Sequence, residues 1–169
     1  MSESGIKLKD VRLTLNGNAG KIDVLRKINL KVELGETVAL IGPSGSGKSS
    51  LLMVLGGLEK STSGSINVLG HNISVMNEDE RAQFRSEHMG IVFQAFHLIP
   101  TMSAVENVAV PLEIKRAHSP YKTAEAILEL VGLKDRANHY PLQLSGGEQQ
   151  RVALARAIVT KPKILLADE

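Results

Sequence analysis

The chain has 169 residues, 43% apolar and 22% charged, which suits one globular domain and excludes disordered, collagen-like and low-complexity proteins. Twenty Lys and Arg residues balance eighteen Asp and Glu residues to a net charge of +2, so the charge gives no support to a nucleic-acid partner. Cysteine is absent, which rules out disulfides, thiolate catalysis and cysteine-based zinc sites.

No segment has the pattern of a secretion signal or a membrane span. The first ten residues are polar and charged, and apolar stretches such as residues 51–58 are far shorter than the roughly 20 residues that cross a bilayer. We therefore expect a cytoplasmic protein that reaches the membrane through a partner. The three Phe and two Tyr residues are too few for a base-stacking surface, so we expect no nucleic-acid partner.

The first part of the chain predicts strands around a glycine-rich loop. Apolar and polar residues alternate over residues 6–34, with Asn16-Gly17-Asn18 and Gly20 between the halves, which is typical of two antiparallel strands joined by a loop. The apolar run 37–41 predicts a strand, and the spacing over residues 48–56 predicts a helix. After these we expect a strand over 65–69, a helix over 77–88 capped by Asn77, and a strand over 89–94.

The second part predicts helices followed by one more strand. Helical apolar spacing recurs over residues 103–115, 121–131 and 145–159 with no strand signal between them, which indicates a helical insertion. The apolar run 163–167 is typical of a buried parallel strand. The fold class is therefore α/β.

The strongest motif matches the phosphate-binding pattern GxxxxGK[ST]. It lies between a predicted strand and a predicted helix, which the mechanism requires, so a plain connecting turn is the weaker interpretation. In this pattern backbone N–H groups surround phosphate oxygens, Lys48 reaches the β- and γ-phosphates, and the Ser49 hydroxyl can bind Mg²⁺. The predicted nucleotide-binding residues are Gly42, Pro43, Ser44, Gly45, Ser46, Gly47, Lys48, Ser49 and Ser50.

Two acids follow the last predicted strand. Asp168 and Glu169 fall at its carboxyl end, where a parallel sheet presents ligands. Asp168 would help to hold Mg²⁺, and Glu169 would polarise the attacking water as a general base. A solvated turn is the alternative, which the phosphate-binding loop upstream disfavours.

A second candidate phosphate-binding surface begins at Ser145. Ser145 and Glu148 have the spacing of a capping box for the following helix. Capping does not require the intervening Gly146 and Gly147, which weaken the first turn by up to ~1 kcal/mol each. They also leave its N–H groups open to an anion, so we predict a phosphate contact there.

Along the chain these motifs come in the order phosphate-binding loop, Ser145–Arg151 and the strand that ends in Asp168-Glu169. In this order they resemble the nucleotide-binding domains of ABC transporters over nearly the whole chain. The resemblance implies a P-loop NTPase with an ABC-type ATPase core, an N-terminal antiparallel β subdomain and a helical subdomain. Residues 1–93 would form the β subdomain and phosphate-loop core, 94–160 the helical subdomain, and 161–169 the Walker B strand. The subunit would bind ATP and Mg²⁺ and hydrolyse ATP.

The family also supplies roles for individual residues. Two subunits of the family sandwich two ATP molecules head to tail, and the signature motif of one faces the γ-phosphate held by the other. That role would pass to Ser145, Gly146, Gly147 and Gln149. Gln94 matches the family's Q-loop glutamine, which senses Mg²⁺ and water, whereas an ordinary polar residue at a strand end is the alternative.

Residues 93–101, followed by Glu106-Asn107-Val108, resemble the subgroup that serves lipoprotein-releasing, macrolide-exporting and FtsX-like permeases, including YbbA-like ATPases. This implies an integral membrane permease that contacts the subunit near Phe96 and Leu98, with core packing of these side chains as the alternative. An FtsE-like regulatory ATPase that moves no substrate stays open as a second function. An ABC protein of DNA repair or translation is disfavoured.

The sequence departs from the family pattern at two places. Leu15 stands where an aromatic ring usually stacks on adenine. The family continues past the catalytic glutamate to a switch histidine, whereas all five histidines here precede residue 169 and are typical of polar surface residues. We therefore expect a partial ATPase domain that lacks the C-terminal part of the core. Residues 1–169 alone are expected to be neither an active enzyme nor a well-folded domain.

Overall fold

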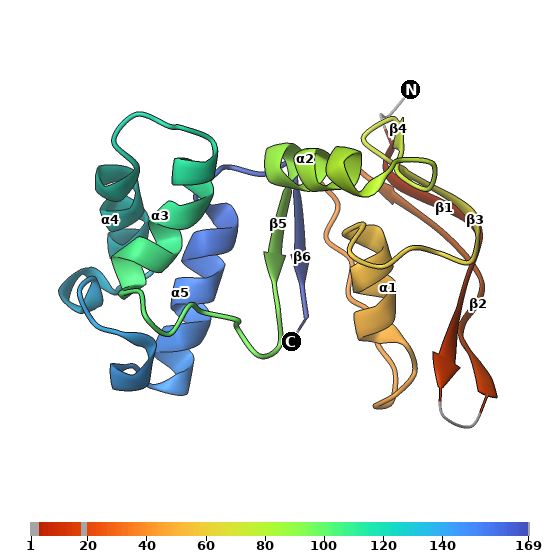
Figure 1. The fold of residues 1–169 in the computed structure, drawn as a ribbon, viewed down its shortest axis with the longest axis horizontal. Coiled ribbons are helices and arrows are strands. Elements are labelled where there is room, and N and C mark those ends of the chain that lie inside the picture. Colours follow the sequence, from red (N-terminus) through yellow and green to blue (C-terminus); the bar gives the residue numbers. More distant parts are fainter. Residues whose placement is uncertain (1–3, 18–19, 169) are drawn as a thin grey trace. The chain divides into compact units, whose positions relative to one another are not determined.

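The computed structural model describes residues 4–17 and 20–168, and the chain forms two compact units, Met1–Arg85 and Ser86–Glu169 (Figure 1). The first unit contains β1 (Ser4–Gly17), β2 (Gly20–Glu33), α1 (Lys48–Leu55), β3 (Ser63–Val68), β4 (His71–Asn72) and most of α2 (Glu78–His88). The second contains β5 (Met89–Val92), α3 (Ala104–Ile114), α4 (Pro120–Leu130), η1 (Lys134–Arg136), η2 (Pro141–Gln143), α5 (Gly146–Ile158) and β6 (Ile164–Ala167).

An antiparallel sheet in the order β2-β1-β3-β4 forms the first unit. Alternation on either side of a register shift between Leu8 and Val11 places one apolar face of β1 inward, so Leu8, Val11 and Leu13 are almost completely buried. Helix α1 adds Val54 to this apolar core. The predicted pair of strands and the predicted helix are thereby confirmed.

Three helices and two parallel strands form the second unit. Helices α3, α4 and α5 enclose an aliphatic core that includes Val108, Leu128 and Val152, each fully buried. Strands β5 and β6 pair in parallel from Met89 opposite Ile164 to Val92 opposite Ala167. The helical insertion and the final strand are where the sequence predicts them.

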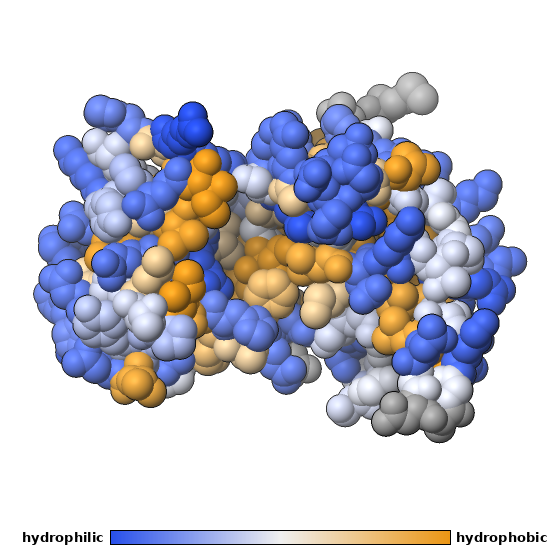
Figure 2. Space-filling model, in the orientation of Figure 1, coloured by the Kyte–Doolittle hydropathy of each residue, from blue (hydrophilic) through white to orange (hydrophobic). Residues whose placement is uncertain are grey.

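Helix α2 is short and hydrophilic, and Figure 2 shows it covered by polar residues. Its start is capped as predicted, because the Asn77 Oδ1 atom accepts a hydrogen bond from the Glu80 N–H at 2.9 Å. Glu78 pairs with Arg81 and Arg85 along its surface. Within residues 4–17 and 20–168, the helices are all too short or too polar to cross a membrane.

The expected strand over residues 37–41 is absent, which corrects the sequence prediction. This segment is irregular, and most of its side chains are exposed, Ile41 by 95% and Val38 by 44%. A strand exists only when a neighbour satisfies its backbone groups, and no strand within the described residues pairs with this segment. The segment has the apolar composition of a strand, but the pairing that a strand requires is not a local property of the sequence.

Candidate functional site

The phosphate-binding loop leads directly into α1. Gly47 caps the helix with a φ of 91°, and a Cβ atom at this position would lie 3.1 Å from the Val24 carbonyl oxygen of β2. Glycine therefore satisfies both the left-handed backbone and the close approach of the loop to the sheet. Within the described residues, no side chain caps α1 and no acid lies in its first turn, so the helix start is available to an anion.

Lys48 binds the backbone at the beginning of the phosphate-binding loop. Its Nζ atom donates to the carbonyl oxygens of Gly42 and Pro43 at 2.9 and 3.0 Å. Residues 42–46 and Ser49 are exposed, so the loop is open to solvent on its outer side. The structure thus brings Gly42 and Pro43 to the Lys48 ammonium group, next to the start of α1.

Gln94 and Asp168 follow neighbouring strand ends in the second unit. Val92 pairs with Ala167, and the Asp168 N–H donates to the Val92 carbonyl oxygen at 3.0 Å. Because β5 and β6 are parallel, two of the three predicted metal residues come from the same edge of this sheet. Gln94 is exposed there, whereas Glu169 lies outside the described residues.

The start of α5 has a capping box, and its two glycines are exposed to solvent. Ser145 Oγ accepts from the Glu148 N–H, and the Glu148 carboxylate accepts from both the Ser145 N–H and hydroxyl, which confirms the capping box. These hydrogen bonds, with that from Arg136, lower the pKa of Glu148 to about 2. No atom lies within 4 Å of where a Gly146 Cβ would be, so this chain's own packing does not require glycine at that position.

Gln149 has contacts that the sequence gives no means to predict. Its Nε2 atom donates to the carbonyl oxygens of Pro141 and Leu144 at 3.0 and 3.1 Å. The side chain therefore ties α5 to the segment before the motif. Its role toward ATP stays a prediction, and in this structure it supports the position of Ser145.

The turn after Gln94 is strained and held by an arginine. Phe96 and His97 are consecutive non-glycine residues with φ values of 59° and 46°, a conformation that costs about 1–3 kcal/mol per residue. Their carbonyl oxygens each accept a 2.7 Å hydrogen bond from the Arg156 guanidinium of α5. Burial lowers the pKa of Arg156.

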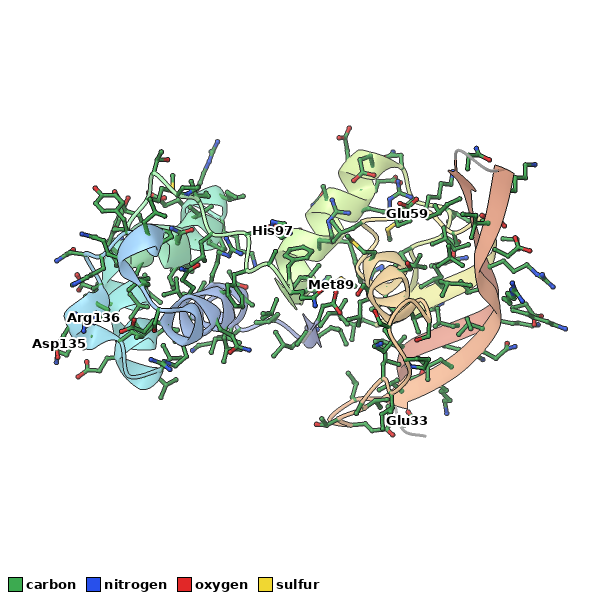
Figure 3. The ribbon with its side chains drawn as sticks, turned by 90° about the horizontal axis from the view of Figure 1, so that it is seen from below. Glu33, Glu59, Met89, His97, Asp135 and Arg136 are labelled. Carbon is green, nitrogen blue, oxygen red and sulfur yellow. The ribbon has the colours of Figure 1, made fainter. Side chains whose placement is uncertain are left out.

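Phe96 and Leu98 are half-buried. Both pack against the cluster formed by Val92, Ala153 and Ala157, so core packing accounts for part of each side chain. His97 between them is exposed, and Figure 3 shows it in the segment that follows β5. The Phe93 and His97 rings meet edge to face, with their centroids 5.1 Å apart.

The comparisons with known proteins agree with these motifs and this fold. The family model described as ABC transporter matches residues 25–169, which is most of the chain. The chain belongs to the ABC transporter family. It is an ATP-binding subunit of such a transporter, and its activity is ATP hydrolysis.

Similar proteins cover nearly all of the chain. A lipoprotein-releasing system ATP-binding protein, LolD, of Zymomonas mobilis is 45% identical over 97% of this chain and 72% of its own length. A macrolide export ATP-binding/permease protein, MacB, of Bdellovibrio bacteriovorus is 44% identical over 97% of this chain and 25% of its own. A solved dimeric ATP-binding cassette in a post-hydrolysis state, bound to ADP and Pi, has a TM-score of 0.93 and 42% identity, covering 97% of this chain and 73% of that one.

In the second unit, Gln94 and Asp168 offer two oxygen ligands of the kind that Mg²⁺ takes in proteins. Within the described residues, no three His, Asp or Glu side chains gather into a metal cluster. Mg²⁺ commonly takes one or two protein oxygens and completes its shell with phosphate and water. The amide of Gln94 and the carboxylate of Asp168 are ligands of this type, whereas Ser49 belongs to the other unit and its part in binding Mg²⁺ stays a prediction.

An aliphatic pair occupies the end of the β1–β2 hairpin. Leu15 of β1 lies opposite Ile22 of β2, and their side chains are 40% and 55% exposed. The same hairpin contacts the phosphate-binding loop, because Val24 and Leu25 approach Gly47. Leu15 is therefore accompanied by a second apolar residue that its strand register brings beside it.

Proposed function

We propose that this subunit drives a membrane permease by closing and reopening a head-to-tail homodimer around two ATP molecules. The observation that carries the proposal is the open first turn of α5. Gly146 is exposed there, and no other part of the chain lies within 4 Å of the position of a Cβ atom at this residue. Such a helix start favours an anion, and the γ-phosphate held by a second copy is an anion of suitable size. The dimeric state of the similar cassette supports this arrangement.

Within each ATP site, different residues of the chain would bind the phosphates, hold Mg²⁺ and activate the attacking water. Residues 42–50 bind the phosphates, with Lys48 moving from the carbonyl oxygens of Gly42 and Pro43 to the β- and γ-phosphates. Ser49, Gln94 and Asp168 would hold Mg²⁺, which neutralises charge on the phosphates when bound. Glu169 accepts the proton of the attacking water.

The base would rest on aliphatic side chains. Leu15 and Ile22 offer an exposed apolar surface on the hairpin beside the phosphate-binding loop. Dispersion against this surface does not distinguish one purine from another, because neither side chain has a hydrogen-bonding group. We therefore propose that recognition rests on the phosphates more than on the base.

The partner would be an integral membrane permease of the lipoprotein-releasing or macrolide-export type, and it would hold the subunit on the inner face of the membrane. The names of the two relatives support this class. The docking surface would lie on the turn near Phe96 and Leu98, whose exposed parts flank His97. A partner that contacts this turn would act on the backbone next to Gln94.

Affinity purification of the full-length tagged subunit from detergent-treated membranes tests the partner. We expect a permease to copurify, and Ala95→Arg to reduce its recovery because residue 95 is exposed on the proposed surface. Lys122→Gln, an exposed change on α4, is the matched control. Recovery of no membrane protein, or equal recovery with both variants, would contradict this surface, and a partner that acts on cell-wall enzymes would favour the regulatory alternative.

A further inference from the structure

The connecting segment, residues 95–103, joins the strand end at Gln94 to helix α3. It contains no helix or strand of its own, yet the structure gives it a defined path. Two polar side chains, one from α5 and one from α3, bind its backbone. Arg156 belongs to no motif that the sequence identifies, whereas Asn107 belongs to the Glu106-Asn107-Val108 segment, to which the sequence assigns no hydrogen-bonding role.

Arg156 binds the first part of the connecting segment. Its two terminal nitrogens donate separately to the carbonyl oxygens of Phe96 and His97, and the two consecutive left-handed residues turn those oxygens toward one guanidinium. Within the described residues, Arg156 forms no ion pair with a carboxylate. A planar fork with fixed donors suits two neighbouring carbonyls, which a lysine could not satisfy in the same way.

Asn107 binds the second part. It is completely buried in α3, and its Oδ1 atom accepts from the Ile99 N–H at 2.7 Å. Its Nδ2 atom donates to the carbonyl oxygens of Ile99 and Met102 at 3.1 and 3.0 Å. A buried amide whose hydrogen bonds all go to one stretch of backbone fixes the conformation of that stretch.

We propose that Arg156 and Asn107 are positioning residues for Gln94: together they fix residues 95–103 between α5 and α3, and so hold Gln94 in place for hydrolysis. Gln94 lies directly before the fixed residues, in a turn that is closed by a hydrogen bond. In this bond the Phe96 N–H donates to the Phe93 carbonyl oxygen at 2.9 Å. Arg156 also links this turn to the helix that begins at Ser145. The inference rests on the proposed role of Gln94.

Steady-state ATP hydrolysis by the full-length subunit separates positioning from binding. We expect Arg156→Ala to lower kcat by about tenfold to a hundredfold, since a displacement of about 1 Å has effects of that size, while KM for ATP stays within about twofold. Arg156→Lys should recover only part of kcat, because it restores the charge but not the fork. Asn107→Ser should lower kcat and speed amide hydrogen exchange at Ile99, whose N–H loses its partner.

Controls distinguish positioning from a general loss of stability. Val108→Ala removes buried methyl groups on the same helix and breaks no side-chain hydrogen bond. It should lower the melting temperature without lowering kcat. A kcat loss in Val108→Ala equal to that in Asn107→Ser would overturn the inference. If Asn107→Ser does not fold, the half-buried Arg156 variants decide the matter.

Gln94→Ala separates the two proposals. If this variant keeps its kcat, the proposed role of Gln94 is wrong. If it loses kcat while Arg156→Ala and Asn107→Ser keep theirs, the role of Gln94 stands and the positioning inference fails. Loss of kcat in all three, with unchanged KM for ATP, supports both.

Discussion

The Ser145 hydroxyl and the Glu148 carboxylate cap the start of α5 reciprocally. Ser145 Oγ accepts from the Glu148 N–H at 3.4 Å, and the Glu148 Oε2 atom accepts from the Ser145 N–H and hydroxyl at 2.8 and 2.7 Å. These hydrogen bonds use the side chains of residues on either side of the two glycines, so Gly146 and Gly147 stay uncovered on the outer side of the turn. The cap therefore holds the proposed phosphate contact without covering it.

This cap predicts a pH-dependent contribution to stability. The folded chain lowers the pKa of Glu148 from 4.5 to about 2, through the Ser145 hydrogen bonds and then Arg136. A lowered carboxyl pKa contributes stability that is complete above the unfolded value and disappears as the pH falls toward the folded value. We expect Glu148→Gln to lower the melting temperature at neutral pH, with the difference from the parent shrinking between pH 4.5 and about 2.

Melting curves of the full-length subunit across this pH range test the cap. Glu125→Gln, an exposed change on α4, is the control and should give no such trend. A melting-temperature difference that stays constant down to pH 2 would show that the Glu148 charge does not carry the effect.

Lys48→Ala should weaken binding of Mg-ATP to the full-length subunit. The ammonium donates to two loop carbonyls and can transfer to phosphate oxygens within the same loop. A hydrogen bond to a charged group is worth about 1.5–3 kcal/mol, so we expect a loss of about tenfold or more in affinity. Titration with a fluorescent ATP analogue measures it, with the exposed Lys60→Ala as control. Equal affinities in the two variants would remove Lys48 from the site.

Glu169→Gln should keep ATP binding and abolish hydrolysis, because an amide cannot accept the proton of the attacking water. A dimer with trapped ATP should then accumulate, which light scattering detects. Adding Ser145→Arg should return the protein to the monomer, since the larger side chain fills the place of the partner's γ-phosphate while each monomer still binds ATP. Hydrolysis that persists in Glu169→Gln would show that another group is the base.

The hairpin predicts weak discrimination between ATP and GTP. Leu15 and Ile22 present only aliphatic surface. Leu15→Tyr would add a ring for stacking, worth about 0.5–1.5 kcal/mol for aromatic pairs, and should raise the affinity for both nucleotides. Competition binding measures the ratio. A strong preference of the parent for ATP would mean that another residue reads the base.

Local signals were sufficient for most helices. The start of α5 could be predicted because Ser145 and Glu148 lie within one turn, and α2 because Asn77 and Glu80 do. The β1–β2 hairpin could be predicted because its alternation and turn are contiguous in sequence. In each of these elements the partners of the backbone groups lie close along the chain.

Long-range partners could not be predicted. The segment 37–41 has strand composition, yet the described residues contain no strand beside it. Arg156 lies about sixty positions from the carbonyls of Phe96 and His97, and no pattern marks that contact. Asn107 lies in a segment that resembles the family, but its complete burial depends on how α3 packs. The resemblance to a family located the site, whereas the bonds that hold it came only from the fold.

Two glycines should respond to alanine in opposite ways. A Cβ atom at Gly90 would collide with the carbonyl oxygen of Ala157, where β5 packs on α5. Backbone atoms cannot yield as a flexible side chain can, so Gly90→Ala should lower the free energy of unfolding by about 1–3 kcal/mol. Gly146→Ala meets no atom within 4 Å, and alanine favours a helix by up to ~1 kcal/mol.

Gly146→Ala should therefore keep or raise stability and still reduce ATP hydrolysis, because its methyl group projects into the space proposed for the partner's γ-phosphate. Urea unfolding and ATP turnover of the full-length subunit, measured for both variants, separate the two effects. Full turnover in Gly146→Ala would mean that the open turn does not approach phosphate. Unchanged unfolding in Gly90→Ala would mean that β5 and α5 are not held as closely as the structure places them. The two variants separate function from folding, because Gly90 is required by the packing of β5 on α5, whereas Gly146 is required only by the phosphate proposed to bind there.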